Sequence, residues 1–186
     1  MKKLISVLFL SLFFSHAHAG SVLDDVVFGV SLIRQDVNLQ INSPGSKVSL
    51  NESATGFGVY VDKYYKKKYR FNSTLNYVAY DLFDLVGLTV SADYLVPLNQ
   101  EVSFFAGLSG GAGMQKYNDV SISDASFGLV YGAEIGAIAY VNSNLMIESG
   151  YRKKLSNIKT EVKSASDMEA ELEEINEFYF NFLLMF

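Results

Sequence analysis

The chain ends with Phe178-Tyr179-Phe180-Asn181-Phe182-Leu183-Leu184-Met185-Phe186, and this stretch carries the clearest structural signal in the sequence. Every second side chain is large and apolar, and the residues between them begin polar. A period of two predicts a β-strand with two different faces. An open apolar edge promotes aggregation in water, whereas lipid accepts the apolar face of a closed barrel. The stretch therefore favours a transmembrane β-barrel over the alternative, an edge strand of a soluble sandwich.

The N-terminus has the pattern of an export signal. Lys2 and Lys3 precede an apolar run over residues 4–14, and small residues follow at Ala17 and Ala19. This order is typical of a secretory signal peptide, and the run is shorter than the roughly 20 residues of a spanning helix. We expect cleavage after Ala19, which divides the chain into a signal peptide (1–19) and a β-barrel domain (20–186).

Composition excludes several classes of function. Without the signal peptide, the chain has 13 Lys and Arg against 20 Asp and Glu, a net charge of −7. An acidic chain with a single basic tract, 66–68, is not expected to bind nucleic acid. It has no cysteine, and both histidines lie in the signal peptide, so histidine-dependent catalysis and metal ligation are not available. We therefore expect no enzyme activity, no cofactor and no metal.

Alternation of apolar and polar residues recurs along the whole chain. The alternating segments are 26–32, 56–62, 69–77, 88–96, 102–114, 126–137, 145–155 and 178–186. Most are close to the ten residues with which a tilted strand crosses lipid. The pattern predicts an all-β fold, an eight-stranded antiparallel up-and-down transmembrane β-barrel.

The connections between these segments differ in length. Three are short, at 63–68, 97–99 and 142–144, whereas we expect four longer ones, at 42–53, 79–84, 116–124 and 156–174. Short turns at one end and long loops at the other are typical of outer-membrane barrels, and an even strand number places both termini at the periplasmic end.

The last of these loops is acidic. Its acidic residues are Glu161, Asp167, Glu169, Glu171, Glu173 and Glu174. They form either a surface for a cationic partner or divalent ions, or a solvated loop without a ligand. Residues 166–175 fit a short helix with a capping box, and extended strand ends fit equally well.

Periodicity alone does not say which face points inward. A lipocalin-like barrel would turn its large apolar residues into the lumen. An eight-stranded barrel, however, has only enough interior for side chains to fill. The Gly-, Ser-, Thr- and Asn-rich face fits that space, and the Phe-, Tyr-, Leu- and Val-rich face is too bulky. We therefore expect the bulky face to contact lipid.

Several charged residues share the inward face. They are Asp62, Arg70, Asp93, Glu134, Glu148, Arg152 and Glu177. Buried charges must be paired, so we expect a polar network that fills the lumen. A three-residue turn at 142–144 places Glu134 opposite Arg152. A hairpin centred on Lys66 would likewise place Asp62 opposite Arg70.

Several motifs resemble a known family. They lie at 94–99, 105–113, 127–136 and 148–152, and at the terminal Phe186. The chain resembles the OmpA-like superfamily of eight-stranded outer-membrane barrels, especially the opacity-type porin family. The resemblance implies the outer membrane of a Gram-negative bacterium, with its lipids and lipopolysaccharide as neighbours.

The same resemblance assigns a role to the C-terminal aromatic residues. In the family, the terminal Phe belongs to a signal that the outer-membrane assembly machinery reads. The corresponding residues here are Phe178, Phe180, Phe182 and Phe186, although the ending Leu184-Met185-Phe186 departs from the common Tyr-Arg-Phe.

Function follows less directly than fold. The leading hypothesis is a structural and interaction barrel that supports envelope integrity, or adhesion to a host or matrix ligand through its extracellular loops. The alternative is a narrow channel for small solutes. A lipid-acting enzyme is disfavoured because the mature chain has no histidine.

Overall fold

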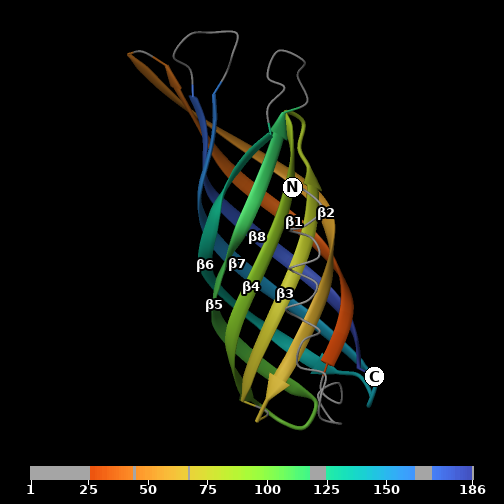
Figure 1. The fold of residues 1–186 in the computed structure, drawn as a ribbon. Helices are drawn as coiled ribbons and strands as arrows, with labels where there is room; N and C mark the ends of the chain where they lie inside the picture. The colour runs from red at the N-terminus through yellow and green to blue at the C-terminus, as the bar shows by residue number, and fades with distance from the viewer. Residues whose placement is uncertain (1–25, 44, 67, 118–124, 162–168, 186) are drawn as a thin grey trace, which may run out of the picture.

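The computed structural model describes residues 26–43, 45–66, 68–117, 125–161 and 169–185, which form eight β-strands (Figure 1). The strands are β1 Val26–Ser43, β2 Ser46–Tyr65, β3 Tyr69–Ala79, β4 Phe83–Pro97, β5 Val102–Tyr117, β6 Ala125–Tyr140, β7 Leu145–Glu161 and β8 Glu169–Met185. Each pairs antiparallel with the next, and β8 pairs with β1 to close the barrel. The predicted fold class is confirmed, while the expected signal peptide, 1–19, lies outside the described residues.

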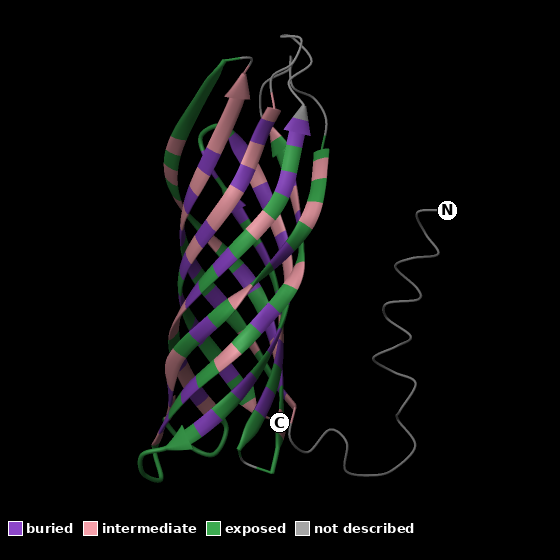
Figure 2. Ribbon diagram, turned by 90° about the vertical axis from the view of Figure 1, so that its left-hand side faces the viewer, coloured by how far each residue is buried: buried purple, intermediate pink, exposed green. Residues whose placement is uncertain are grey.

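The two faces of each strand are arranged as predicted. On β8, Phe178, Phe180 and Phe182 are exposed, whereas Tyr179 and Asn181 between them are buried in the lumen. Figure 2 shows the same alternation of buried and exposed residues along the other strands. The bulky apolar face therefore points outward, and the lipocalin-like arrangement is excluded. The described residues contain no helix long and apolar enough to span a membrane.

The strands are longer than the alternating segments, and two of the four predicted long loops, 42–53 and 156–174, are wrong. In place of the loop 42–53, β1 and β2 pair up to Ser43 and Ser46. Only three residues separate β3 from β4. Most of the predicted loop 156–174 belongs to β7 and β8. Residues 118–124 of the predicted loop 116–124 lie outside the described residues. Apolar alternation marks only strand parts that face lipid, whereas polar strand ends pair their backbones equally well in water.

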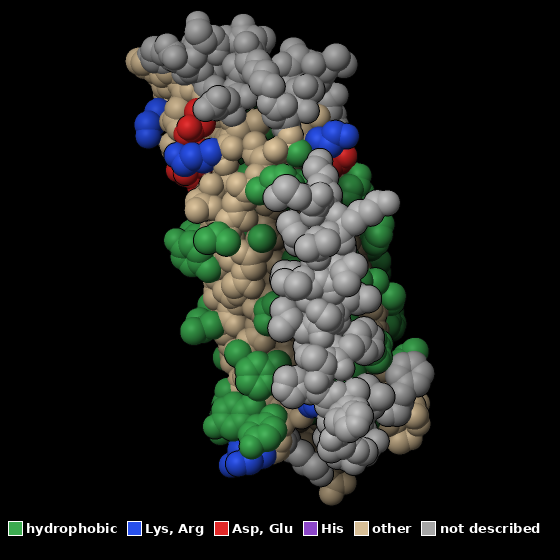
Figure 3. Space-filling view, viewed as in Figure 1, with side chains coloured by type: hydrophobic (Ala, Val, Ile, Leu, Met, Phe, Trp, Pro, Cys, Tyr) green, Lys and Arg blue, Asp and Glu red, His purple; other side chains and the backbone are tan. Residues whose placement is uncertain are grey.

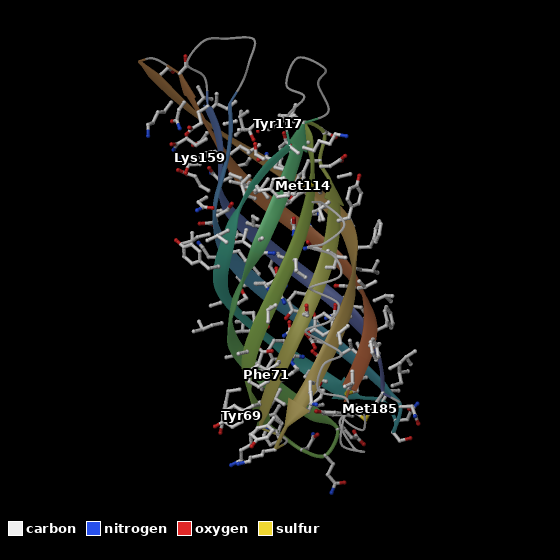
Figure 4. All side chains as sticks on the ribbon, viewed as in Figure 1. Tyr69, Phe71, Met114, Tyr117, Lys159 and Met185 are labelled. Atoms are coloured by element: carbon white, nitrogen blue, oxygen red, sulfur yellow. The ribbon has the colours of Figure 1, made fainter. Side chains whose placement is uncertain are left out.

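A sheet protrudes from one end of the barrel, which is the upper end in Figure 1. It consists of residues 36–43 of β1, 46–55 of β2, 158–161 of β7 and 169–176 of β8, and we call it the extension. Its outward-facing side chains are mostly polar. The tight turns and the last residue of β8, Met185, lie at the opposite, lower end (Figure 4).

A bulge in the extension explains the helix-like spacing of the sequence. Leu172 and Ile175 are three residues apart, yet both are buried in the lumen. The register of β8 against β1 shifts between Asn38 and Leu39, because β8 inserts one extra residue there. Such a bulge restores the same face after an odd number of residues. Of the two open alternatives, the described residues 169–175 adopt the extended one.

Candidate functional site: a charged lumen and a protruding sheet

One buried guanidinium organises the lower half of the lumen. Arg70 on β3 donates from Nε to Asp93 Oδ2 on β4 at 2.8 Å, and from Nη1 to Glu148 Oε2 on β7. Its plane lies over the ring of Phe105, 4.2 Å from the centroid. Asp62 on β2 is a looser partner, 3.7 Å from Arg70 Nη1. Arg70 thus holds carboxylates from three strands.

A second guanidinium repeats this arrangement above the first. Arg152 on β7 donates from Nε to Glu134 Oε2 on β6 and from Nη1 to Glu177 Oε1 on β8, the latter at 2.8 Å. The ring of Tyr179 lies 4.9 Å from the guanidinium carbon. Lys154 Nζ donates to the other oxygen of Glu177, also at 2.8 Å. The predicted ion pair of Glu134 with Arg152 inside the barrel is confirmed, as is their register.

Asn72 joins the two halves of this network. Its Nδ2 donates to Asp93 Oδ2 at 2.9 Å and to Glu134 Oε1 at 3.1 Å. Gly107 on β5 lies between these two carboxylates in the ladder, opposite Asp93 on one side and Glu134 on the other. A Cβ at Gly107 would fall 1.9 Å from Asp93 Oδ1. The carboxylate of Asp93 therefore fits at this junction because residue 107 has no side chain.

The predicted register of the β2–β3 hairpin is wrong. Asp62 lies opposite Asn72, and Tyr64 lies opposite Arg70. The ladder closes at Tyr65 and Tyr69, so the turn is centred one residue later than expected and includes Lys66 with a φ of 53°. The guanidinium of Arg70 nevertheless reaches Asp62 diagonally across the ladder.

All seven charged residues placed inward by the sequence are buried inside the barrel. Sequence reasoning missed Lys154, although it has the same parity on β7 as Arg152. It also missed the neutral partners Gln35 and Asn76, whose amides donate to Glu177 at 2.5 and 3.3 Å. Among the described buried residues, five carboxylates meet three cations. The lumen therefore holds more acid than base.

Apolar side chains close both ends of the lumen. The upper apolar layer comprises Val37, Leu39, Val78, Phe83, Leu85, Ile158, Leu172 and Ile175, and the lower comprises Val27, Leu95, Phe105, Ile138, Met146 and Leu183. Single strands show this order: the inward residues of β4 begin with Phe83, become polar from Thr89 to Asp93, and end with Leu95. Along the strands, the charged network thus lies between two groups of buried apolar side chains.

One small cavity lies beside the charged network. The cavity, of about 10 Å³, lies among Gln35, Asn76, Thr89 and Lys154. That volume is at the lower limit for one water molecule. No group of three or more Asp, Glu, His or Cys suited to a metal ion occurs among the described residues.

The outer surface divides into an apolar belt and a charged upper end. Figure 3 shows apolar side chains over the middle and lower part of one face, and charged ones gathered mainly at its upper end. Tyr69 and Phe71 project from the lower end of β3, whereas Lys159 lies near the upper end (Figure 4). An apolar band bordered by aromatic and charged residues is the surface that a bilayer requires.

The acidic residues of the predicted loop lie mainly on a strand. Glu169, Glu171, Glu173 and Glu174 belong to β8, and Glu161 ends β7, while Asp167 lies outside the described residues. With Asp36 and Glu52, three of them line an open depression of about 560 Å³ on the extension. The residues are Glu171, Glu173 and Glu174.

Ion pairs on the outer face of the extension stay charged over a wide pH range. Lys159 lies 3.0 Å from Glu169 and 3.1 Å from Glu171, and these contacts raise the pKa of Lys159. Hydrogen bonds from Asn176 and Lys153 lower the pKa of Glu174. The contribution of the Lys159 pairs to folding stability is therefore lost only when the pH rises through the raised pKa of Lys159. The contribution of Glu174 is lost only when the pH falls through its lowered pKa. At such exposure each pair contributes little to stability.

Comparison with known proteins identifies the fold. No protein-family model matches the sequence, and no curated protein sequence matches it either. Among solved structures, Neisserial surface protein A (NspA) is similar, with a TM-score of 0.59 and 14% identity over 86% of this chain and 97% of NspA. Outer membrane protein OprG from Pseudomonas aeruginosa has a TM-score of 0.59 and 14% identity, over 88% of this chain and 96% of OprG.

A third similar structure is outer membrane protein H (OprH) from P. aeruginosa, solved in DHPC micelles. Its TM-score is 0.59 at 21% identity, over 87% of this chain and 99% of OprH. The chain therefore has the fold of the eight-stranded outer-membrane β-barrels, and the resemblance inferred from its motifs is confirmed at that level.

Proposed function

We propose that the chain is an integral outer-membrane barrel that acts as a structural and interaction protein, with the extension as its contact surface. The observation that carries this proposal is the closed lumen. Ion pairs join β3 to β7 across the interior, and an apolar layer lies on either side of them. A barrel that is filled in this way anchors a surface in the membrane and has no room for a substrate.

The outer surface supports the membrane part of the proposal. Side chains such as Leu108 and Phe127, each 73% exposed, would be unfavourable in water in such number, and are favourable against lipid tails. In this orientation the lower end faces the periplasm and the extension stands outside the cell. Its upper boundary then meets the lipopolysaccharide leaflet, where Arg34 and Lys153 are exposed at the end of the belt.

The extension supports the interaction part. Four strands continue past the belt although the barrel needs no further length to cross the bilayer. Their outward side chains are polar and their positions are set by backbone ladders, so they present a rigid surface rather than a set of loose loops. Adhesion to a host or matrix ligand uses such a surface, whereas a channel does not require it.

The test uses two variants of the purified protein in lipid. In the first, residues 41–48 are replaced by a two-residue turn that joins Gln40 to Ser49, which are opposite in the ladder. We expect a folded, heat-modifiable barrel that has lost binding to epithelial cells and to matrix proteins. The second shortens the lower turn at 98–101 by one residue and should keep binding.

Planar-bilayer recording separates the proposal from the narrow-channel alternative. The wild type and the shortened variant should both lack steady conductance steps, because the two apolar layers lie in series. Large and steady steps from both proteins, with no loss of cell binding on shortening, would overturn the proposed function in favour of solute transport.

A further inference from the structure

One edge of the extension has no pairing partner. β2 pairs with β1 from Ser46 to Lys63, but its pairing with β3 begins only at Gly56. Residues 46–55 therefore have a ladder on one side alone, as far as the described part of the chain is concerned. A strand edge of ten residues leaves alternate backbone N–H and C=O groups free to pair with another strand.

The other edge of the extension is closed by contrast. On β7, Asn157 Oδ1 accepts a hydrogen bond from the backbone of Leu129 on β6 at 2.7 Å. Thr160 Oγ1 donates to Ser126 Oγ, also on β6, at 2.8 Å. Register shifts further disrupt β7 and β8 at this level. The β2 edge has no such shift against β1, with which it pairs in continuous register from Ser46 onward.

The sequence of this edge lacks most devices that block edge pairing. Natural edges are protected by proline, by inward charges, by bulges or by shortness. Here Pro44 precedes the strand, and residues 46–55 contain no proline, one lysine at Lys47 and one carboxylate at Glu52. The rest are Ser, Val, Leu, Asn, Ala and Thr.

The two faces of the edge define what could pair with it. Lys47, Ser49, Asn51 and Ser53 are exposed on the outer face, whereas Val48, Leu50, Glu52 and Ala54 share the inner face. Val48 is 49% exposed. The carboxylate of Glu52 accepts a hydrogen bond from the backbone of Leu82 and lies near Asp81, while its Oε2 has no hydrogen-bond partner in the described structure. A strand added here would meet an apolar face that continues inward, and a basic residue on it could pair with the neighbouring carboxylates of Glu52 and Asp81.

We propose that residues 46–55 of β2 form a docking edge for an extended, amphipathic and cationic segment of a partner protein, which adds to the extension as a further strand. This inference rests on the proposed function, and it names the surface and the chemistry of the partner. Main-chain hydrogen bonds supply the affinity, and alternate side chains supply the specificity. The partner turns its apolar residues toward Val48 and Leu50 and a basic residue toward Glu52.

A second copy in the same membrane is a poorer occupant on geometric grounds. Strands of such barrels tilt roughly 35–45° from the membrane normal. Two upright copies related by an axis along that normal would cross their edges at about 70–90°, which follows from the same tilt. That arrangement is neither parallel nor antiparallel, so it forms no ladder.

The experiment follows individual amides of the protein in lipid nanodiscs. The probe is a synthetic ten-residue peptide in which valine alternates with threonine and lysine. The control peptide has the same composition except for one central proline, which removes a ladder donor. We expect the probe to slow hydrogen exchange at alternate amides of residues 46–55 by at least tenfold, and the control peptide to leave them unchanged.

Two variants test the edge and the charge separately. Ser49→Pro should weaken probe binding at least tenfold, while heat modifiability reports that the barrel still folds. Glu52→Lys should weaken binding of the lysine peptide and strengthen binding of a peptide with glutamate in its place, which a merely destabilised extension would not do. Lys159→Arg, on the outer face of β7 and away from the β2 edge, serves as the control and should bind the probe as the wild type does.

The results have distinct consequences. Binding without amide protection in residues 46–55, or equal binding by Ser49→Pro and wild type, would overturn the docking edge. Protection that appears without peptide when two vesicle populations are mixed would replace it with pairing between copies in opposed membranes. Cell binding that is lost on shortening 41–48 but kept by Ser49→Pro would leave the proposed function standing while the docking edge fails.

Discussion

The guanidinium of Arg70 on β3 contacts the carboxylate of Glu148 on β7, so one ion pair joins opposite walls of the barrel. Both side chains are fully buried, and Arg70 also holds Asp93 at 2.7 Å. A charge that is buried in this way is stable only while its partners remain. The pair therefore couples the closure of the barrel to the charge balance of the lumen.

Replacing Arg70 with methionine should destabilise the barrel by about 3–5 kcal/mol, because it leaves several carboxylates buried without their cation. The double variant Arg70→Met, Glu148→Gln should lose less than the two single variants together. Urea unfolding in lipid vesicles measures both, followed by circular dichroism because the chain has no tryptophan. If the double variant loses as much unfolding free energy as the two single variants together, Arg70 and Glu148 are not coupled.

Asp62→Asn should behave differently from Arg70→Met. Asp62 lies 3.7 Å from Arg70, the longest of the buried ion pairs among the described residues, and the buried carboxylates described there outnumber the cations. Removing its charge should change stability by less than about 1 kcal/mol or increase it, since like charges in one site disfavour each other. A loss as large as that of Arg70→Met would show that Asp62 is essential to the network.

Gly107→Ala should disturb the junction of Asp93 and Glu134. The new Cβ would fall 1.9 Å from Asp93 Oδ1 and 2.5 Å from the backbone oxygen of Ala92. Overpacking of this kind costs about 1–3 kcal/mol. Gly110→Ala on the same strand is the matched control, because nothing lies within 4 Å of its Cβ. Equal unfolding midpoints for the two variants would argue against the junction.

Leu108→Arg should destabilise the barrel in lipid by about 2–4 kcal/mol, the cost of a cation near the middle of the bilayer. Leu108 is highly exposed, and in a soluble protein a substitution at such a surface position would leave the free energy of unfolding nearly unchanged. Ser49→Arg, on the exposed part of the extension, should fold as the wild type does. The comparison of urea midpoints in vesicles places the boundary of the belt between the two positions.

Deleting Phe186 should lower the folded, heat-modifiable fraction in the outer membrane, because the C-terminal aromatic pattern is expected to recruit the assembly machinery. Phe186 lies outside the described residues, so this prediction comes from the sequence alone. Phe186→Tyr keeps the aromatic ring and should assemble normally. Unchanged levels after the deletion would remove the terminal residue from the assembly signal.

The sequence by itself determined the strand number, the closure and the faces. Side chains alternate strictly along a strand, so a repeated apolar face in segments of membrane length admits few folds. The pair Glu134 and Arg152 was predictable for the same reason, because a tight turn sets the register of its hairpin. The outward orientation of the bulky residues could be predicted from the volume of the barrel interior, because eight strands enclose too little space for them.

The tertiary structure decided what alternation does not encode. The shift of Asp62 against Arg70 depends on one turn residue, and the common face of Leu172 and Ile175 depends on a bulge. The apolar layers arise because strands tilt, so residues far apart in sequence reach the same height in the lumen. The open edge of β2 likewise exists only because β3 ends, at Ala79, lower than β1 ends, at Ser43, a relation between strands that local residue patterns do not contain.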